Sequence, residues 1–146
     1  MSTTIRSEII ATLRGVAPTE DPRKRYTCDD DASGARVALE DAVDNGAYRR
    51  FDLRSLGSTD LGMTGVTVVR YREDMEVRVG YYARGADMAR LDRIMAQDAR
   101  DIILTLRNPA NYGSADALIP GREAPVVAET ENGLIMSVPV TAVYVQ

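Results

Sequence analysis

The first apolar pattern along the chain repeats every three to four residues and predicts an amphipathic helix near the N-terminus. Its members are Ile5, Ile9, Leu13 and Val16. The hydroxyl of Thr3 or Thr4 can cap the first turn, and Pro18 closes the segment. From Thr19 to Gly34 the chain is polar, which predicts a surface excursion with little regular structure.

The segment from Val66 to Leu106 is the most informative part of the sequence. Its first half predicts two strands, Val66–Arg72 and Met75–Ala83, joined by a turn at Glu73-Asp74. Because strand side chains alternate, Met75, Val77, Val79 and Tyr81 share one face, and Glu76, Arg78, Gly80 and Tyr82 share the other. One face is apolar and the other charged, which indicates an antiparallel sheet that is covered on one side.

A long helix is predicted directly after this hairpin, with Asp87 as its N-cap and Asn108-Pro109 at its end. Its apolar stripe is formed by Met88, Leu91, Met95, Ala99, Ile102 and Leu106, widened by Ile94 and Ile103. The charged residues Asp92, Arg93, Asp98, Arg100 and Asp101 are expected mostly on the opposite face. A hairpin followed by a helix favours an antiparallel sheet with a helix across it over a parallel βαβ arrangement.

Between these two parts, the pattern predicts a shorter helix from Ser33 or Gly34 to Asn45 and a strand from Tyr48 to Leu56. The glycine-containing segment Gly57–Gly65 is expected to be a flexible or tightly bent loop. Asn111–Pro125 is expected to be a long exposed loop.

The C-terminal part predicts a second hairpin. Its strands are Val126–Thr130 and Leu134–Val145, with a turn at Asn132-Gly133. Pro139 lies inside the last strand and is therefore expected at a sheet edge or a bulge. The whole pattern predicts one α+β domain spanning residues 1–146, built on a mainly antiparallel β-sheet with an N-terminal helix and a long helix packed on one face.

Composition and charge then limit the functions that this domain can have. The chain has 146 residues, 45% of them apolar and 27% charged, with a net charge of −4. The acidic balance argues against nucleic acid as the main partner, although a local basic patch stays open. No segment approaches the ~20 apolar residues of a membrane span, and the first residues lack the pattern of a signal peptide. The single cysteine, Cys28, cannot form an internal disulfide, and a reducing cytosol is expected.

The sequence contains no histidine. This removes the commonest general base and the commonest transition-metal ligand, so Ser-His-Asp hydrolysis and His-based metal chemistry are excluded. There is also no glycine-rich phosphate loop of the dinucleotide-binding or Walker type. We therefore expect no enzyme, and we assign no catalytic, cofactor-binding or metal-binding residues.

Two residue groups carry minor candidate chemistry. Asp29-Asp30-Asp31 could bind a hard cation, but the run lacks the ligand spacing of an EF-hand, and a solvated acidic loop is favoured. Tyr71, Tyr81 and Tyr82 are expected to fill or rim the sheet rather than to stack on bases.

The arginines are the stronger candidates for a binding surface. Arg23-Lys24-Arg25 with Arg49, Arg50 and Arg54 form either a basic patch facing DNA or an acidic protein, or a set of solvated charges. Arg70, Arg72, Arg78 and Arg84 punctuate the predicted charged face of the sheet. They either pair across strands with Glu73 or Glu76, or contribute to a subunit interface. We retain all seven residues from Arg49 onward as interface candidates.

Three segments give the layout a family likeness: Ile5–Ile10, the passage from Val77 through Tyr82 to Leu91, and Leu134–Val140. With its N-terminal helix, hairpin, long helix and late C-terminal strand, the chain resembles the tail terminator (tail completion) proteins of long-tailed bacteriophages. The resemblance implies a hexameric ring in the virion tail, assembled in the host cytoplasm. It also implies that the ring caps the tail tube, stops its polymerisation and meets the head completion or neck proteins, while DNA passes through its lumen without specific binding.

The shorter helix and the segment Asn111–Pro125 have no counterpart in this resemblance. Other interpretations therefore stay open. One alternative is a different neck component, such as a head–tail stopper, or a tube protein. A second alternative, from another class, is a small cytosolic α+β enzyme or ligand-binding domain that uses carboxylates or tyrosine. A third is an adaptor that binds one partner through its exposed sheet.

Overall fold

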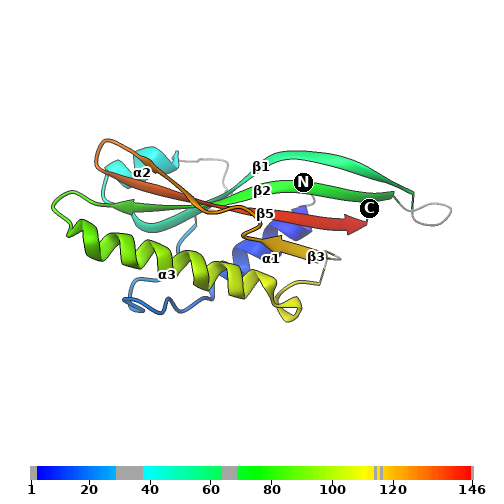
Figure 1. The fold of residues 1–146 in the computed structure, drawn as a ribbon, viewed down its shortest axis with the longest axis horizontal. Helices are drawn as coiled ribbons and strands as arrows, with labels where there is room; N and C mark the ends of the chain where they lie inside the picture. The colour runs from blue at the N-terminus through cyan, green and yellow to red at the C-terminus, as the bar shows by residue number, and fades with distance from the viewer. Residues whose placement is uncertain (1–2, 29–37, 64–68, 114, 116, 146) are drawn as a thin grey trace.

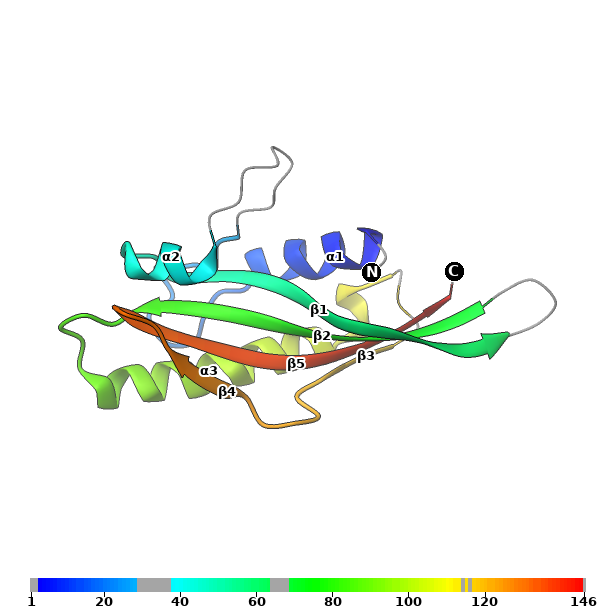
Figure 2. The same cartoon turned by 90° about the horizontal axis from the view of Figure 1, so that it is seen from above.

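A computed structural model of the chain describes residues 3–28, 38–63, 69–113, 115 and 117–145. It is a single α+β domain with one five-stranded antiparallel sheet and helices on both faces (Figures 1 and 2). The helices are α1 (Thr3–Arg14), α2 (Leu39–Asp44) and α3 (Met88–Arg107), followed by a 3₁₀ turn at Pro109–Asn111. The strands are β1 (Tyr48–Met63), β2 (Val69–Tyr82), β3 (Ala117–Pro120), β4 (Val126–Glu129) and β5 (Gly133–Val145). The predicted fold class is confirmed.

The strand order is β1-β2-β5-β3, with β4 also paired to β5. The first part of β5 pairs with β4, and its later part, from Val140 to Val143, pairs with β3. Pro139 lies between these two ladders, and its carbonyl accepts a hydrogen bond from the Gly121 N–H at 2.9 Å. The expectation that Pro139 marks a sheet edge is therefore wrong. β5 is an interior strand that tolerates proline because the missing N–H faces the gap between β4 and β3.

The core lies between one face of the sheet and the helices α1 and α3. The alternation predicted for β2 is confirmed, since Met75, Val77, Val79 and Tyr81 are at most 1% exposed. The helices contribute Ile5, Ile9, Ile10 and Leu13 from α1, and Leu91, Ile94, Met95, Ala99, Ile102 and Leu106 from α3. Burying a large apolar side chain contributes roughly 1.5–3 kcal/mol, so these two stripes account for much of the stability of the fold.

The predicted turn at Glu73-Asp74 is wrong, because β2 runs through both residues without interruption. Glu73 is 1% exposed on the core face, and Asp74 accepts hydrogen bonds from Arg72 and from the Thr141 hydroxyl. Two charged residues therefore have in-register places in the sheet. The hairpin is instead formed by β1 and β2. Residues 64–68, which connect the two strands, lie outside the described residues.

The predicted loop Gly57–Gly65 is also wrong over its first seven residues, which belong to β1. Gly57 and Gly62 have φ angles of +146° and +93°, and each lies at a shift in the β1–β2 register. Glycine in such a conformation permits a bulge within a strand, so these glycines bend β1 without ending it. The second half of the predicted loop Asn111–Pro125 likewise contains β3.

Helix α2 is shorter than predicted within the described residues, and positions 33–37 lie outside them. It lies on the side of the sheet opposite α3 (Figure 1), where Leu39 and Val43 form a small cluster with Ile135. The sheet is thus covered at one end on both faces. Where α2 passes over the sheet, β2 and β5 carry Gly80 and Gly133, and a Cβ at either position would collide with Val43.

The far end of the β1–β2 hairpin projects beyond α1 (Figures 1 and 2). All residues from Arg54 to Gly62 are exposed. We call residues 54–63 and 69–72 the arm. It carries two exposed apolar side chains, Leu56 and Leu61, which are 56% and 49% exposed.

Candidate functional site

Arg49 is the most unusual residue of the described chain. Tyr48 pairs with Tyr81 and Arg50 pairs with Gly80, so Arg49 is the extra residue of a bulge in β1. Its φ of +54° places it in the left-handed region, which costs a residue with a side chain on the order of 1–3 kcal/mol. The bulge directs the arginine into the core, where its side chain is 0% exposed.

The guanidinium group of Arg49 donates five hydrogen bonds. Two reach the Asp98 carboxylate, from Nε at 2.8 Å and from Nη2 at 2.9 Å. The other three reach backbone carbonyls of the segment before β1: those of Glu20 at 2.6 Å, Asp21 at 2.7 Å and Lys24 at 2.9 Å. A guanidinium has five N–H groups, so this buried charge is fully hydrogen-bonded.

Three tyrosines complete this group, which we call the Arg49 cluster: Arg49, Asp98, Tyr26, Tyr48 and Tyr81. The Tyr81 hydroxyl donates a hydrogen bond to Asp98 at 2.7 Å. The centres of the Tyr26 and Tyr48 rings each lie 5.7 Å from the guanidinium carbon of Arg49. Burial, and then the charge of Asp98, raise the pKa of Tyr26 and Tyr81. Burial alone would lower the pKa of Arg49, but its bonds to Asp98 outweigh that effect and raise it. The cluster thus contains one ion pair and neutral phenols, and joins β1, β2, α3 and residues 20–26.

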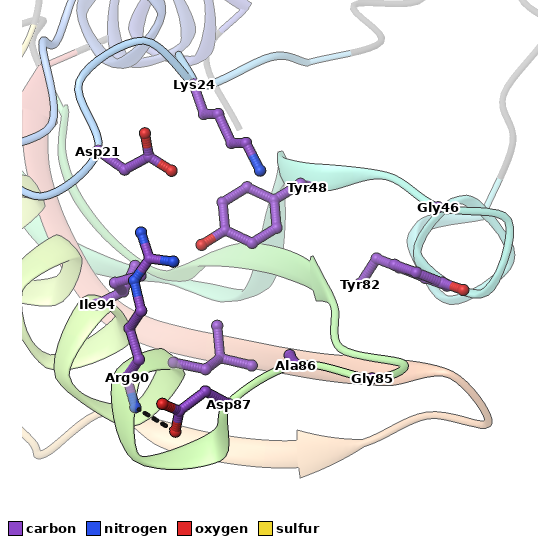
Figure 3. A pocket seen from close by; sticks show the side chains of 11 residues that line it. Asp21, Lys24, Gly46, Tyr48, Tyr82, Gly85, Ala86, Asp87, Arg90 and Ile94 are labelled. Atoms are coloured by element: carbon purple, nitrogen blue, oxygen red, sulfur yellow. Dashed lines mark hydrogen bonds between the residues drawn. The ribbon is translucent and has the colours of Figure 1, made fainter.

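A cavity of about 390 Å³ lies beside the Arg49 cluster (Figure 3). Leu91 and Ile94 supply apolar contacts, while Lys24, Arg90 and Asp21 bring charges of both signs. The Lys24 Nζ lies 4.5 Å from the centre of the Tyr48 ring. Asp87 is occupied as the N-cap of α3 and accepts a hydrogen bond from the Arg90 N–H at 3.3 Å. Burial raises the pKa of Tyr48, so its phenol is neutral near pH 7. The arrangement suits binding of a polar group rather than nucleophilic catalysis.

Five of the predicted interface residues share the sheet face opposite α3: Arg50, Arg54, Arg70, Arg72 and Arg78. Arg78 binds Asp52 with two hydrogen bonds, at 2.9 and 2.5 Å, and Glu40 of α2 at 2.7 Å. The bonds to Asp52 raise the pKa of Arg78 and outweigh the opposing effect of burial. Arg54 pairs with Glu76, and Arg72 with Asp74. Glu73 was expected as a partner, but its side chain is on the core face.

The other predicted residues lie in different surroundings. Arg49 is a correction, because a fully buried arginine cannot face a partner. Arg49 lies in the core and is therefore not part of a surface patch around Arg23-Lys24-Arg25. Arg84 is exposed in the turn between β2 and α3. An interface role for the surface arginines stays a prediction.

Sequence reasoning missed Asp98, which was expected on the solvent face of the long helix and is instead 0% exposed. A signal was present, because Asp98 follows Ile94 and precedes Ile102 at four-residue spacing, within the apolar stripe. Met88 shows the reverse error, since it was placed in the stripe and is 47% exposed.

A second hollow, which we call the α3–β4 groove, lies between those two elements and has a volume of about 660 Å³. Its apolar walls include Ala99, Ile103 and Leu104 of α3 and Val127 of β4. No local pattern predicts this groove, because it depends on how two elements that are distant in the chain pack together.

In the part of the chain that the structure describes, no three His, Cys, Asp or Glu side chains are grouped so as to hold a metal ion. None of the helices there has the length and apolar character needed to cross a membrane. The candidate cation site Asp29-Asp30-Asp31 lies outside the described residues.

Comparison with known proteins gives no family assignment. No protein-family model matches the chain, and its sequence matches no curated protein. The resemblance to tail terminators thus stays an expectation from the sequence.

Proposed function

We propose that this chain is a structural protein of a phage virion. It forms a ring, expected to be hexameric, that caps the tail tube, ends tube polymerisation and connects the tube to head completion or neck proteins. The observation that carries this proposal is the sheet itself, which in the described part of the chain has open edges on both sides and an arm that projects beyond α1. These are features of a protomer that associates with other chains.

The two sides of the sheet are different surfaces. On one side, among the described residues, β1 pairs with β2 and otherwise makes only the short bridge between Thr27 and Arg50. On the other side, the described parts of β3 and β4 pair only with β5. An open strand edge presents unpaired N–H and C=O groups that invite another chain. Contacts between two different surfaces of identical chains are head-to-tail and close into a ring when the rotation permits.

The charged sheet face is consistent with a contact surface in such an assembly. Arg54, Arg72 and Arg78 are held in ion pairs, which orders their side chains before any partner binds. Arginine is enriched at protein interfaces, and pre-ordered side chains lose less entropy on binding. In the proposed ring, DNA passes through the lumen without specific binding, in keeping with a net charge of −4.

A tube-polymerisation assay tests the proposed function. Tail-tube protein of the same virus is polymerised with and without the purified chain, and tube length and tube ends are measured by electron microscopy. We expect shorter tubes whose ends carry an added ring. Unchanged tube length and bare ends would contradict the capping role. Binding to isolated head or neck complexes, without binding to tubes, would indicate a stopper instead.

The cavity beside the Arg49 cluster favours a second candidate function, binding of a small polar ligand. Lys24 and Arg90 would receive an anionic group of that ligand, with Leu91 and Ile94 against its apolar part. Thermal-shift screening of small carboxylates and phosphates, with Arg90→Ala as the control variant, would test this function. A ligand that stabilises the parent chain but not the variant would support it.

A further inference from the structure

The α3–β4 groove combines an apolar floor with charged lining residues, the two arginines Arg100 and Arg107 and one carboxylate, Asp92, so its charge is positive on balance. Leu104 and Val127, on opposite walls, are 54% and 48% exposed. Arg100, Leu104 and Arg107 follow at intervals of four and three residues, so they lie along one stripe of α3. In the described part of the chain, the side chains of these two arginines form no ion pair and no hydrogen bond. The groove therefore suits an apolar side chain accompanied by a carboxylate.

The arm presents that combination. Leu61 is 49% exposed, and its neighbour Asp60 is also exposed. In a regular strand, neighbouring side chains point to opposite faces. Here the β1–β2 register shifts between Asp60 and Met63, and Asp60 Oδ1 accepts a hydrogen bond from the Gly62 N–H at 2.6 Å. This irregularity interrupts the alternation and allows Asp60 and Leu61 to contact the same surface.

The arm and the groove of one chain are too far apart to meet. Asp60 is aligned with Tyr71 of β2, whereas Val127 is aligned through Met136 with Val79. Eight residues of β2 separate Tyr71 from Val79, a distance of about 26 Å at roughly 3.3 Å per residue. The arm consists of parts of β1 and β2, whereas the groove is lined by β4, which pairs with β5 on the side of the sheet away from β1 (Figure 2).

We propose that the arm of one protomer docks into the α3–β4 groove of a second copy of this chain. Leu61 packs against Ile103 and Leu104, and the Asp60 carboxylate pairs with Arg100 or Arg107. Because the two surfaces differ, the contact is head-to-tail and leaves a free arm and a free groove at the ends of every open chain of protomers. This inference rests on the proposed ring function and specifies the contact that builds the ring.

Cysteine cross-linking between two variants tests this contact. Leu61→Cys and Leu104→Cys are each made in a Cys28→Ala background and oxidised separately and as a mixture. We expect a disulfide-linked dimer in the mixture and none in either variant alone, because each variant supplies one half of the contact. The matched control replaces Leu104→Cys by Met88→Cys, a similarly exposed position at the other end of α3, and should give no dimer.

A charge exchange tests the ionic part of the contact. Asp60→Arg should weaken self-association at least tenfold, measured by sedimentation, and Arg100→Asp with Arg107→Asp in the same chain should restore it. Asp60, Arg100 and Arg107 are exposed, and Asp60→Arg removes one local hydrogen bond from the Gly62 N–H. The variants should therefore keep the circular dichroism spectrum of the parent chain and lose little in melting temperature.

Different outcomes separate the docking contact from the ring itself. Rings that form without any disulfide between the cysteines introduced at positions 61 and 104 would overturn the docking contact and leave the ring proposal intact. Cross-linking of Leu104→Cys to a tube-protein segment in place of Leu61→Cys would also overturn it. A chain that stays monomeric in all conditions, tail tubes included, would overturn both.

Discussion

At the scale of single residues, Arg49 combines three features that are costly separately. It has a left-handed backbone, a charge in the core and no solvent contact. Five hydrogen bonds and the facing Asp98 carboxylate offset these costs. Because three of the acceptors are carbonyls of residues 20–24, the side chain also fixes the path of the segment that follows α1. The most distinctive polar group of this protein is thus structural.

Replacing either member of the buried pair should strongly destabilise the protein. Asp98→Asn leaves Arg49 with an uncompensated charge, and Arg49→Lys cannot form the two parallel bonds to a carboxylate. Breaking a buried pair by removing one partner costs about 3–5 kcal/mol, to be measured by urea unfolding. The control is Arg54→Lys in the exposed pair with Glu76, where a change of at most about 1 kcal/mol is expected. Equal losses in the two pairs would contradict the special role of Arg49.

The tyrosines of the Arg49 cluster predict instability in alkali. The pKa of Tyr26 and of Tyr81 is raised in the folded protein above the ordinary value of 10.0, mainly by burial. The unfolded chain therefore loses these protons first. Their contribution to stability is complete below about pH 10 and declines as the pH rises above it. Urea unfolding between pH 8 and 11 should show this decline, and Tyr81→Phe should make it shallower. An identical pH slope in the variant would contradict this origin.

At the scale of elements, the docking of α2 depends on two glycines. Leu39 and Val43 of α2 approach the sheet closely because Gly80 and Gly133 have no side chain there. A Cβ on Gly133 would collide with the backbone carbonyl of Tyr81 as well as with Val43. The three atoms nearest to a Cβ on Gly80 all belong to side chains of α2, so a second substitution can relieve its collision.

Gly80→Ala should destabilise the protein by about 1–3 kcal/mol, the usual cost of overpacking a core. Adding Val43→Ala should recover part of this loss, since it removes the methyl group that the new Cβ meets. Gly15→Ala is the control, because its Cβ would lie 3.4 Å from the nearest atom, an ordinary contact with the Thr12 carbonyl. A double variant no more stable than Gly80→Ala would show that α2 does not dock as described.

Some secondary-structure elements could be predicted from local sequence signals, and others could not. Helix α3 was predicted within one or two residues, because a cap at Asp87, an apolar stripe and Asn108-Pro109 are all local signals. The prediction of a turn at Glu73-Asp74 was wrong, because two adjacent polar residues are typical of a turn. Their partners within the sheet, such as Thr141 for Asp74, are not apparent from the local sequence. Gly57 and Gly62 look like loop residues, yet they form bulges whose existence depends on pairing with β2. Strand register is set by distant segments and could not be predicted locally.

For the candidate surfaces, Arg70, Arg72 and Arg78 were predicted on the charged face of the sheet and lie there, whereas Arg84 lies in the turn after β2. Arg50 and Arg54 were assigned to a separate basic patch and lie on that same sheet face. The sequence could not separate Arg49 from them, because a bulge of one residue reverses the direction of a side chain. The α3–β4 groove was also beyond prediction, since Leu104 and Val127 come together only through tertiary packing.

At the scale of the whole molecule, the fold is a sheet with helices at one end, an arm at the other and different surfaces at its two edges (Figures 1 and 2). Such a protomer is suited to head-to-tail association, which yields either a closed ring or an open filament. The proposed role as a tail terminator requires the closed form, since a filament would extend indefinitely and could not cap a tube.

Native mass spectrometry with negative-stain imaging of the purified chain, alone and mixed with tail tubes, tests this central claim most directly. We expect a discrete assembly of six copies and ring-shaped particles with six-fold symmetry, either free or bound at tube ends. A chain that is monomeric at all concentrations and does not bind tubes would contradict the account, as would filaments of unlimited length.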